Sequence, residues 1–206
     1  MTLDQIIRDS QRAVGALDDG KPGIDTWTRI HARLVPPVIR RPVNVPPPLI
    51  TGGIVDARSE ESIYTLHERV RPYARALVTR AAAAGITLKI ISGLRSYDAQ
   101  NALYAQGRSK PGSIVTKARG GYSNHNFGIA FDIGIFDGTK YLAESPRYKA
   151  AAAIGIDLGL EWGGNWKGIQ DEPHYQLRPS WAADMRDGVM LAELRRRKDS
   201  GRDYFA

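Results

Sequence analysis

Two histidines and one aspartate have the residue types and neighbours of a metal site. His125 and Asp132 both lie in the segment SNHNFGIAFD, and the chain contains only 4 histidines. His174 follows a proline in DEPHYQL, at the start of a short predicted strand. Two imidazoles and one carboxylate leave a coordination position open for water, which is the arrangement of hydrolytic zinc sites. These residues predict an open zinc site, and unrelated surface residues are the alternative.

A hydrolytic metal site also needs a base and a group that stabilises negative charge. Asp171 lies three residues before His174, where its carboxylate can reach a metal-activated water without binding the metal, so we predict that it is the base. Arg95, in SGLRSY, directly follows a predicted strand and could bind a substrate carboxylate or stabilise an oxyanion; a structural ion pair is the alternative. Trp166, in EWGGNW, could line a substrate cleft or pack within its own loop.

A predicted strand over residues 129–135 would hold Asp132 in place. Its apolar side chains alternate with small or polar ones, which indicates that one face of the strand packs on a core. The apolar set is Ile129, Phe131, Ile133 and Ile135. Asp132 falls on the opposite face, between Ala130 and Gly134, so we expect it to point into a cleft with room for a substrate.

The rest of the chain alternates between helix and strand signals, and the pattern predicts an α+β fold with a small antiparallel sheet flanked by helices. The other predicted elements are a helix over 59–84 that ends at Gly85, a strand over 86–92, a helix from the N-cap Ser96 to Gly107, a helix opened by Ser145 and Pro146 and closed by Gly159, a strand over 174–178 and a basic peripheral helix over 180–198.

The start of the chain has a different organisation. Residues 1–35 have helical patterns on both sides of LDDGKPGIDTW and predict a short helical N-terminal appendage. Residues 36–53 include PPVIRRPVNVPPP, where repeated prolines fix φ and remove hydrogen-bond donors, so we expect an extended linker there. Residues 54–206 would then form the main domain.

The composition narrows the chemistry that is available. The 206 residues include no cysteine, which excludes disulfides, thiolate metal ligands and cysteine nucleophiles. No run approaches the length of a membrane-spanning segment, and the N-terminus lacks the apolar core of a signal peptide. We therefore expect a protein that is made in the cytoplasm without a signal peptide and has no membrane span.

The charge points to a negatively charged environment. The formal net charge is +7 and the pI is about 9.7, so polyanions such as nucleic acids, anionic lipids or acidic cell-wall polymers would attract the chain. The basic residues are scattered, apart from RRRK at 195–198. No basic stretch is interleaved with aromatic residues, so we expect no nucleic-acid partner, although the charge alone allows one.

Three segments together resemble a known family. SGLRSYDAQNALYAQGR, GGYSNHNFGIAFDIG and LEWGGNWKGIQDEPHYQ are similar to the VanY-like zinc peptidases, which comprise D-alanyl-D-alanine carboxypeptidases and L-alanyl-D-glutamate endopeptidases and include several phage endolysins. The resemblance covers about residues 54–178. It implies a hedgehog/D-Ala-D-Ala peptidase-like fold. The implied roles are zinc ligands for His125, Asp132 and His174, catalytic base for Asp171 and binding of the substrate or transition state for Arg95.

The same resemblance suggests further site residues and one departure. Ser123 matches a serine of the family motif and Gln100 matches its glutamine after the arginine, and with Trp166 we expect them to bind substrate. Asn165 stands where the family often has an aspartate, which puts a second carboxylate near the site in doubt. At the other end of the chain, LDDGKPGIDTW resembles a signature of peptidoglycan-binding helical repeats, although residues 1–35 are shorter than such a module.

The resemblance implies a zinc-dependent peptidase that cleaves the stem peptides of peptidoglycan. The segment LYAQGRSKPGSIVTKARGG favours an L-alanyl-D-glutamate endopeptidase, and a D-alanyl-D-alanine carboxypeptidase is the alternative within the same enzyme class. A non-catalytic wall-binding module that keeps the fold is the alternative of another class. We expect a monomer that reaches the cell wall after release by a holin or by lysis.

Overall fold

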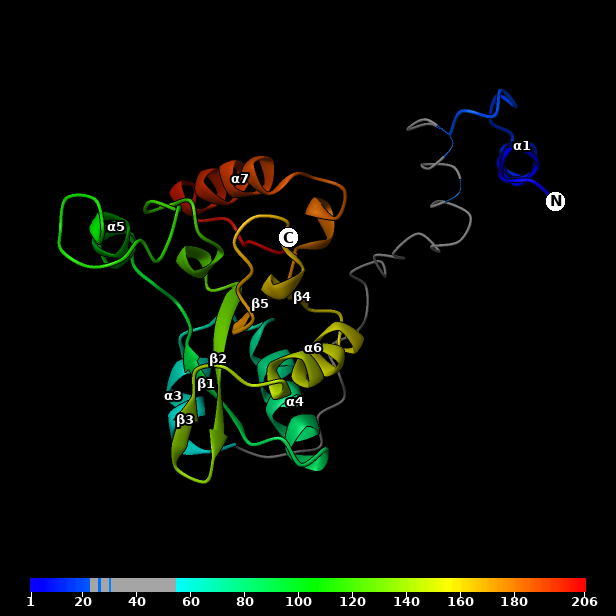
Figure 1. Ribbon diagram of the computed structural model, residues 1–206. Coiled ribbons are helices and arrows are strands. Elements are labelled where there is room, and N and C mark those ends of the chain that lie inside the picture. Colours follow the sequence, from blue (N-terminus) through cyan, green and yellow to red (C-terminus); the bar gives the residue numbers. More distant parts are fainter. Residues whose placement is uncertain (23–25, 27–29, 31–54) are drawn as a thin grey trace. The chain divides into compact units, whose positions relative to one another are not determined.

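A computed structural model describes residues 1–22, Thr26, Ile30 and 55–206 of the protein (Figure 1). The chain divides into two compact units, 1–40 and 41–206. The proline-rich linker predicted at 36–53 and most of the helical pattern before it lie outside the described residues.

The N-terminal unit contains α1 (Leu3–Ala13), whose first turn is capped from both directions. Gln5 N donates to Thr2 Oγ1 at 3.2 Å, and Thr2 N donates to Gln5 Oε1 at 2.8 Å. Gln11 is buried and holds the following loop, because its Oε1 accepts from Gly20 N and its Nε2 donates to Asp19 Oδ1, each at 2.9 Å. Arg8 adds hydrogen bonds to the carbonyls of Asp18 and Asp19, so two side chains of α1 hold the LDDGK stretch against the helix.

The main unit is built on a small antiparallel sheet, as predicted. The strand order is β1-β2-β5-β4, and β3 pairs with the distal end of β2. The five strands are β1 (Leu88–Ser92), β2 (Ala130–Asp137), β3 (Lys140–Leu142), β4 (Glu161–Trp162) and β5 (His174–Gln176). β2 is therefore central, with partners on both edges.

The core lies on one face of β2. The alternating side chains Ile129, Phe131, Ile133 and Ile135 are all 0% exposed, as the sequence pattern predicted. Burial of each such side chain is worth about 1.5–3 kcal/mol relative to exposure, so this face fixes which way the strand points. Figure 1 shows helices behind the sheet, namely α3 (Ala57–Tyr64) and α4 (Arg71–Ala83), and α6 (Arg147–Asp157) packs against α4 and β4.

The single helix expected over 59–84 is wrong, because two helices, α3 and α4, occupy this range. Pro72 lies in the first turn of α4, where its missing N–H is tolerated; inside a continuous helix its ring would clash with the carbonyl four residues earlier. The segment between the two helices also makes a contact with the candidate site. His67 N donates to Gly128 O at 3.0 Å, which ties the interhelical segment to the turn that follows His125.

Two other helices begin near their predicted starts. Ser96 caps α5 (Tyr97–Ala105), with Ala99 N donating to Ser96 Oγ at 3.1 Å, and the helix ends two residues before Gly107. α6 begins just after Ser145 and Pro146, and the chain leaves it through Gly159, whose φ of +91° suits glycine.

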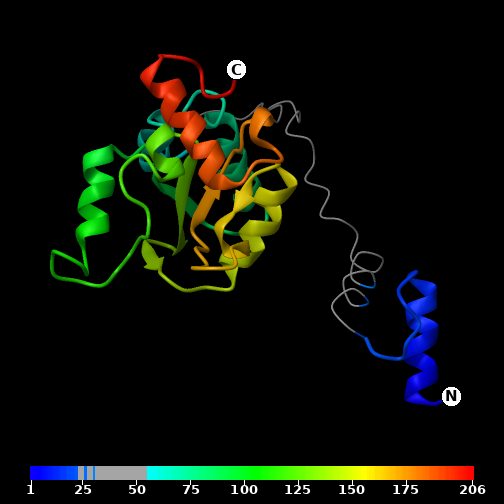
Figure 2. The same cartoon turned by 90° about the horizontal axis from the view of Figure 1, so that it is seen from above.

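The peripheral helix expected over 180–198 needs correction. A short 3-10 turn, η3 (Ser180–Ala182), precedes α7 (Asp187–Asp199). Arg178 Nη1 donates hydrogen bonds to the carbonyls of Ala182 and Met185, at 3.5 and 3.3 Å, so these carbonyls belong to a turn and not to a continuous helix. α7 is also not merely peripheral, since its buried side chains Met190, Leu191 and Leu194 join the core. Figures 1 and 2 show α7 over one end of the sheet, where it contacts η1 (Asn124–Phe127).

No helix among the described residues is long and apolar enough to cross a membrane.

Gly155, inside α6, provides a test of the packing between the helix and the sheet. A Cβ at this position would lie 2.4 Å from Tyr175 Cε1, so we expect Gly155→Ala to lower the free energy of unfolding by about 1–3 kcal/mol. Gly188→Ala in α7 is the matched control, because nothing lies within 4 Å of its Cβ position, and it should raise stability by up to about 1 kcal/mol. Urea unfolding measures both values. Equal stabilisation by the two alanines would contradict this packing.

Candidate active site

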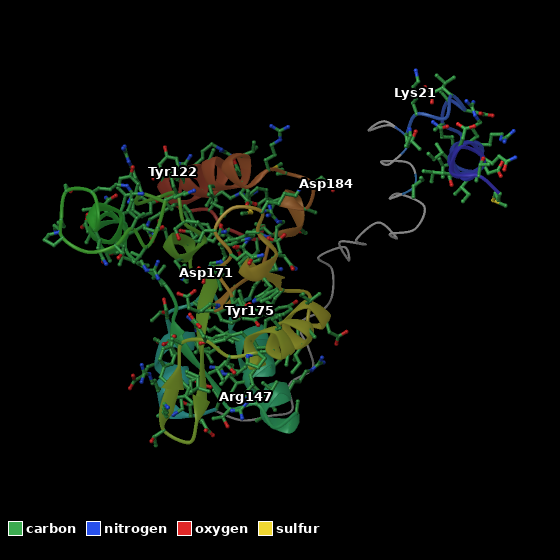
Figure 3. All side chains as sticks on the ribbon, in the orientation of Figure 1. Lys21, Tyr122, Arg147, Asp171, Tyr175 and Asp184 are labelled. Atoms are coloured by element: carbon green, nitrogen blue, oxygen red, sulfur yellow. The ribbon has the colours of Figure 1, made fainter. Side chains whose placement is uncertain are left out.

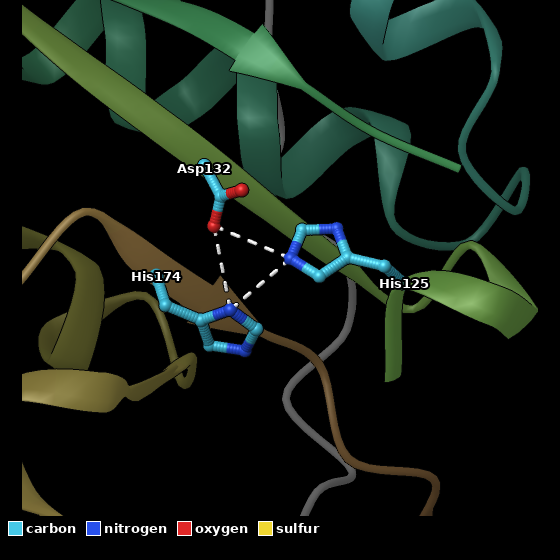
Figure 4. A group of neighbouring side chains, drawn as sticks. All are labelled: His125, Asp132 and His174. Carbon is cyan, nitrogen blue, oxygen red and sulfur yellow. Dashed lines mark hydrogen bonds and ion pairs between the residues drawn. The ribbon is translucent and has the colours of Figure 1, made fainter. Parts of the chain in front are cut away.

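His125, Asp132 and His174 converge on one point in front of β2 (Figure 4). His125 Nε2 lies 3.2 Å from Asp132 Oδ1 and 3.2 Å from His174 Nδ1. His174 Nδ1 lies 3.4 Å from the same Asp132 oxygen. Both imidazoles are buried, and the carboxylate is 19% exposed. Three potential ligand atoms from three separate segments thus form a nearly equilateral triangle.

The size of this triangle fits zinc. Zinc bonds to imidazole nitrogen and carboxylate oxygen are about 2.0–2.2 Å long, and tetrahedral geometry then places neighbouring ligand atoms about 3.3 Å apart. The three distances of 3.2 to 3.4 Å match this spacing. Three protein ligands also leave the fourth tetrahedral position open, as catalytic zinc sites require.

Strand register brings two of these residues together. Asp132 and His174 are direct partners in the antiparallel pairing of β2 and β5, and they lie on the face opposite the core. His125 comes from η1, which leads into β2 through Gly128. Gly128 has a φ of +64°, and a Cβ there would lie 2.9 Å from His67 N, so only glycine suits this turn.

Each histidine has a second partner that determines which nitrogen faces the site. His125 Nδ1 lies 2.9 Å from Gly93 O, and a carbonyl can only accept, so Nδ1 carries the proton and Nε2 is free. His174 Nε2 lies 3.0 Å from Gln176 Oε1, which leaves its Nδ1 free. The two rings therefore present different nitrogens to Asp132.

The electrostatics of the site favour an ionised aspartate. Burial would raise the pKa of the Asp132 carboxyl, but its contacts with His125 and His174, whose imidazoles can each take up a second proton and then donate to it, outweigh burial and hold that pKa well below its usual range. Burial also opposes the charge of His174, yet Asp132 raises the pKa of this imidazole. An anionic oxygen is therefore available as a hard ligand, and a metal ion would compete with a proton for His174.

Arg95 lies beside the triangle. Its Nη2 is 3.5 Å from Asp132 Oδ2, the carboxylate oxygen that faces away from the histidines, and 3.2 Å from Ser92 Oγ. Its backbone N donates to His125 O at 2.9 Å. Arg95 forms an ion pair with Asp132 and also lines the cavity in front of the site. The structural ion pair and the position in the site, which the sequence left as alternatives, are therefore both present.

Gln100 lies behind Arg95 and not on the cavity wall. It is 0% exposed, accepts from Arg95 Nη1 at 3.0 Å and donates to Ala118 O at 2.9 Å. The Gln100 side chain therefore connects Arg95 to the loop that contains Ala118. Gln100 is not among the residues that line the cavity. Direct substrate contact by Gln100 does not fit this burial.

The cavity measures about 680 Å³, and His125, Asp132 and His174 all line it. Its wall includes Ser123, Trp166 and Asp171 together with residues of α7 and of the loop after α5. The Trp166 ring centroid lies 4.8 Å from that of His174. Figure 3 shows Asp171 near the middle of the main unit, at the level of the sheet.

Asp171 is partly buried, and burial raises the pKa of its carboxyl, an effect that nearby His174 opposes. The backbone holds it firmly, because Asp171 N donates to Gly163 O and Asp171 O accepts from His174 N, each at 3.2 Å. Gly163 has no room for a side chain, since a Cβ there would lie 2.6 Å from Asp171 O. The glycines of EWGGNW thus permit the close approach that positions this carboxylate.

Asn126 is a site residue that sequence reasoning missed. It is 2% exposed, its Nδ2 donates to Arg95 O at 2.8 Å, and its Oδ1 accepts from Gly121 N at 2.8 Å. Asn126 therefore joins the Arg95 loop to the His125 turn. A second asparagine right after the histidine in SNHNFG was the signal available for it. Asn165, the departure from the family pattern, is exposed at the end of η2 (Gly163–Asn165).

Comparison with solved structures finds two peptidases. The chain is similar to the L-Ala D-Glu endopeptidase ChiX of Serratia marcescens, with 26% identity, a TM-score of 0.48, and coverage of 60% of this chain and 89% of that one. It is also similar to a vancomycin-resistance D,D-pentapeptidase VanY solved in complex with Zn(II), with 21% identity, a TM-score of 0.44, and coverage of 63% and 83%.

Comparison of sequences gives a closer match. The chain is 39% identical over 127 residues to the peptidoglycan L-alanyl-D-glutamate endopeptidase CwlK of Bacillus subtilis (strain 168), which covers 56% of this chain and 75% of that protein. The family model described as VanY, D-alanyl-D-alanine carboxypeptidase, matches residues 64–179, a range that contains every candidate site residue discussed above. This match spans more than half of the chain, which therefore belongs to the VanY family of D-alanyl-D-alanine carboxypeptidases.

Proposed function

We propose that the protein is a zinc-dependent peptidase that cleaves the stem peptides of peptidoglycan as an L-alanyl-D-glutamate endopeptidase. The observation that carries the proposal is the triangle of ligand atoms, with edges of 3.2 to 3.4 Å, on the wall of a cavity of about 680 Å³. The choice of bond is supported by 39% identity to CwlK, whose name states that activity.

His125, Asp132 and His174 would hold the metal. When bound, zinc polarises a carbonyl oxygen and makes a water molecule nucleophilic at neutral pH. Asp171, on the cavity wall, accepts the proton of the attacking water and returns it to the leaving amine. Burial raises the pKa of the Asp171 carboxyl, which brings it closer to the operating pH and makes the carboxylate a stronger proton acceptor than a fully solvated one.

Arg95 would bind negative charge on the substrate or the charge that develops on the scissile carbonyl oxygen. Gln100 and Ser92 hold its guanidinium from behind, at 3.0 and 3.2 Å, so its direction is set before substrate arrives. Ser123 and Trp166 would contact the peptide along the cavity wall. Gln100 would act through Arg95, as a positioning residue.

D-alanyl-D-alanine carboxypeptidase activity is the second candidate, and the description of the matching family model supports it. A non-catalytic wall-binding module is less well supported, because a complete set of three ligand atoms and a neighbouring carboxylate would serve no purpose in it. We propose that the enzyme acts at the cell wall as a monomer, after release by a holin or by lysis, and that its basic charge suits the anionic wall polymers there.

Metal removal and product analysis test the function together. We expect the purified full-length protein to release fragments with new N-terminal D-Glu or D-isoglutamine from peptidoglycan, as measured by mass spectrometry. EDTA should abolish this release and added Zn²⁺ should restore it. Free D-Ala as the product would assign the carboxypeptidase activity instead. Hydrolysis that is indifferent to chelation would refute the metallopeptidase proposal.

A further inference from the structure

We propose that Gln176 is a positioning residue that selects which ring nitrogen of His174 faces the metal, and that Glu161 fixes Gln176 in the orientation needed for this. The inference rests on the proposed metal site and adds the residues that set its affinity. Neither residue lines the cavity, so their effect passes through His174 and not through contact with substrate.

The first step is the contact between His174 and Gln176. Both side chains lie on the same face of β5, and His174 Nε2 is 3.0 Å from Gln176 Oε1. An amide oxygen only accepts hydrogen bonds, so Nε2 must carry the proton. Nδ1 then has a lone pair, and this is the atom that lies 3.2 Å from His125 Nε2 and 3.4 Å from Asp132 Oδ1.

The second step is the orientation of the Gln176 amide, which its other partners determine. Gln176 Nε2 donates to Glu161 Oε2 at 2.7 Å, and a carboxylate can only accept. Asn124 Nδ2 donates to Gln176 Oε1 from another side. A flipped amide would place its NH₂ against Asn124 Nδ2 and its oxygen against the Glu161 carboxylate, so the oxygen belongs on the His174 side.

The third step is the anchoring of Glu161. Glu161 and Gln176 are direct cross-strand partners of β4 and β5. Arg178 Nε and Nη2 bind the two oxygens of Glu161 at 2.6 and 3.1 Å, and Arg178 also pairs with Asp187 at the start of α7. Arg178 is 7% exposed. A paired and hydrogen-bonded buried arginine is costly to move, so it holds Glu161 firmly.

The two histidines differ in how their orientation is secured. His125 donates from Nδ1 to the backbone carbonyl of Gly93, which stays in place whatever side chain neighbours it. His174 depends on the side chains of Gln176 and Glu161. Side-chain substitution can therefore release His174 and leave His125 in place. Outer-shell partners of this kind typically change metal affinity 10–100-fold when they are removed.

The test compares Gln176→Leu, Glu161→Gln and the control Tyr175→Phe in the full-length protein. Tyr175 lies between the two β5 residues and its hydroxyl has no partner among the described residues, so its loss should leave zinc binding within twofold of wild type. Competition with a chromophoric chelator gives the Kd for Zn²⁺. We expect the Kd to rise about 10–100-fold in Gln176→Leu and about three- to tenfold in Glu161→Gln, where the amide that replaces the carboxylate is a weaker acceptor for Gln176 Nε2.

A second readout separates positioning from general loosening of the fold. Long-range ¹H–¹⁵N spectra of the zinc-loaded wild type should show His174 protonated at Nε2 and bound through Nδ1. We expect additional ring forms in Gln176→Leu, while the His125 signals remain unchanged.

The outcomes distinguish this inference from the proposed function. A Kd for Gln176→Leu within twofold of that for Tyr175→Phe would overturn the inference alone; if Gln176→Leu does not fold, the same comparison is made with Glu161→Gln. Wild-type protein that binds zinc but cleaves no peptidoglycan would overturn the function and leave the positioning role intact. Wild-type protein that binds no zinc would overturn both.

Discussion

Asp171→Asn should lower kcat for stem-peptide hydrolysis by about 10²–10⁴-fold and leave the Kd for Zn²⁺ nearly unchanged. The amide has almost the same size as the carboxylate but cannot accept the proton of the attacking water. The backbone hydrogen bonds of Asp171 to Gly163 and His174 do not involve its side chain, so the loop should keep its path. Initial rates of fragment release and chelator competition measure the two quantities.

Glu172→Gln is the matched control, because it removes the neighbouring carboxylate, whose ion-pair partner in the structure is the exposed Lys149 at 3.9 Å. We expect its kcat to stay within about threefold of wild type, since exposed ion pairs contribute little. Equal rates for the Asp171 and Glu172 variants would show that Asp171 is not the base. Loss of zinc binding in Asp171→Asn would instead make Asp171 a ligand.

Asp132→Asn should have an even broader effect, because it removes the negative charge from the ligand triangle and keeps the side-chain volume. We expect the Kd for Zn²⁺ to rise more than about 100-fold, which is the upper end of the range for residues that only support a ligand. Hydrolysis at micromolar zinc should become undetectable. The same substitution removes the carboxylate partner of Arg95, 3.5 Å away. Chelator competition and fragment release are again the measurements.

Asp137→Asn, at the exposed end of the same strand, controls for the effect of an asparagine in β2. It should match wild type in zinc affinity and rate, because it lies far along the strand from Asp132. If Asp132→Asn bound zinc as tightly as Asp137→Asn, the three-ligand site would be wrong.

The sequence predicted the sheet and the position of Asp132 well, because alternation is a local property of a strand. Once Ile129, Phe131 and Ile133 face the core, the pleat places Asp132 on the other side whatever the rest of the fold does. Ser96 could likewise be identified as an N-cap, since its side chain bonds to an amide only three residues away.

The errors arose where distant partners override a local pattern. The apolar spacing over 59–84 continues through Pro72, but that proline and the bond from His67 to Gly128 divide the range into two helices. In the same way, Arg178 uses carbonyls that a helix over 180–198 would have needed. The structure also shows what the motif position of Gln100 could not, namely that its partners across the loop bury it beside Arg95.

By itself, the sequence determined which groups are available: two imidazoles, a strand carboxylate, a second carboxylate three residues before His174 and an arginine, with family motifs that suggest their roles. Only the tertiary structure decided which nitrogen each imidazole presents. That choice depends on what the other ring nitrogen meets, which is a backbone carbonyl at Gly93 for His125 and an amide held by Glu161 for His174. These partners meet through strand register and loop packing, and hydrogen-bond direction is fixed only once donors and acceptors lie within about 3 Å of one another.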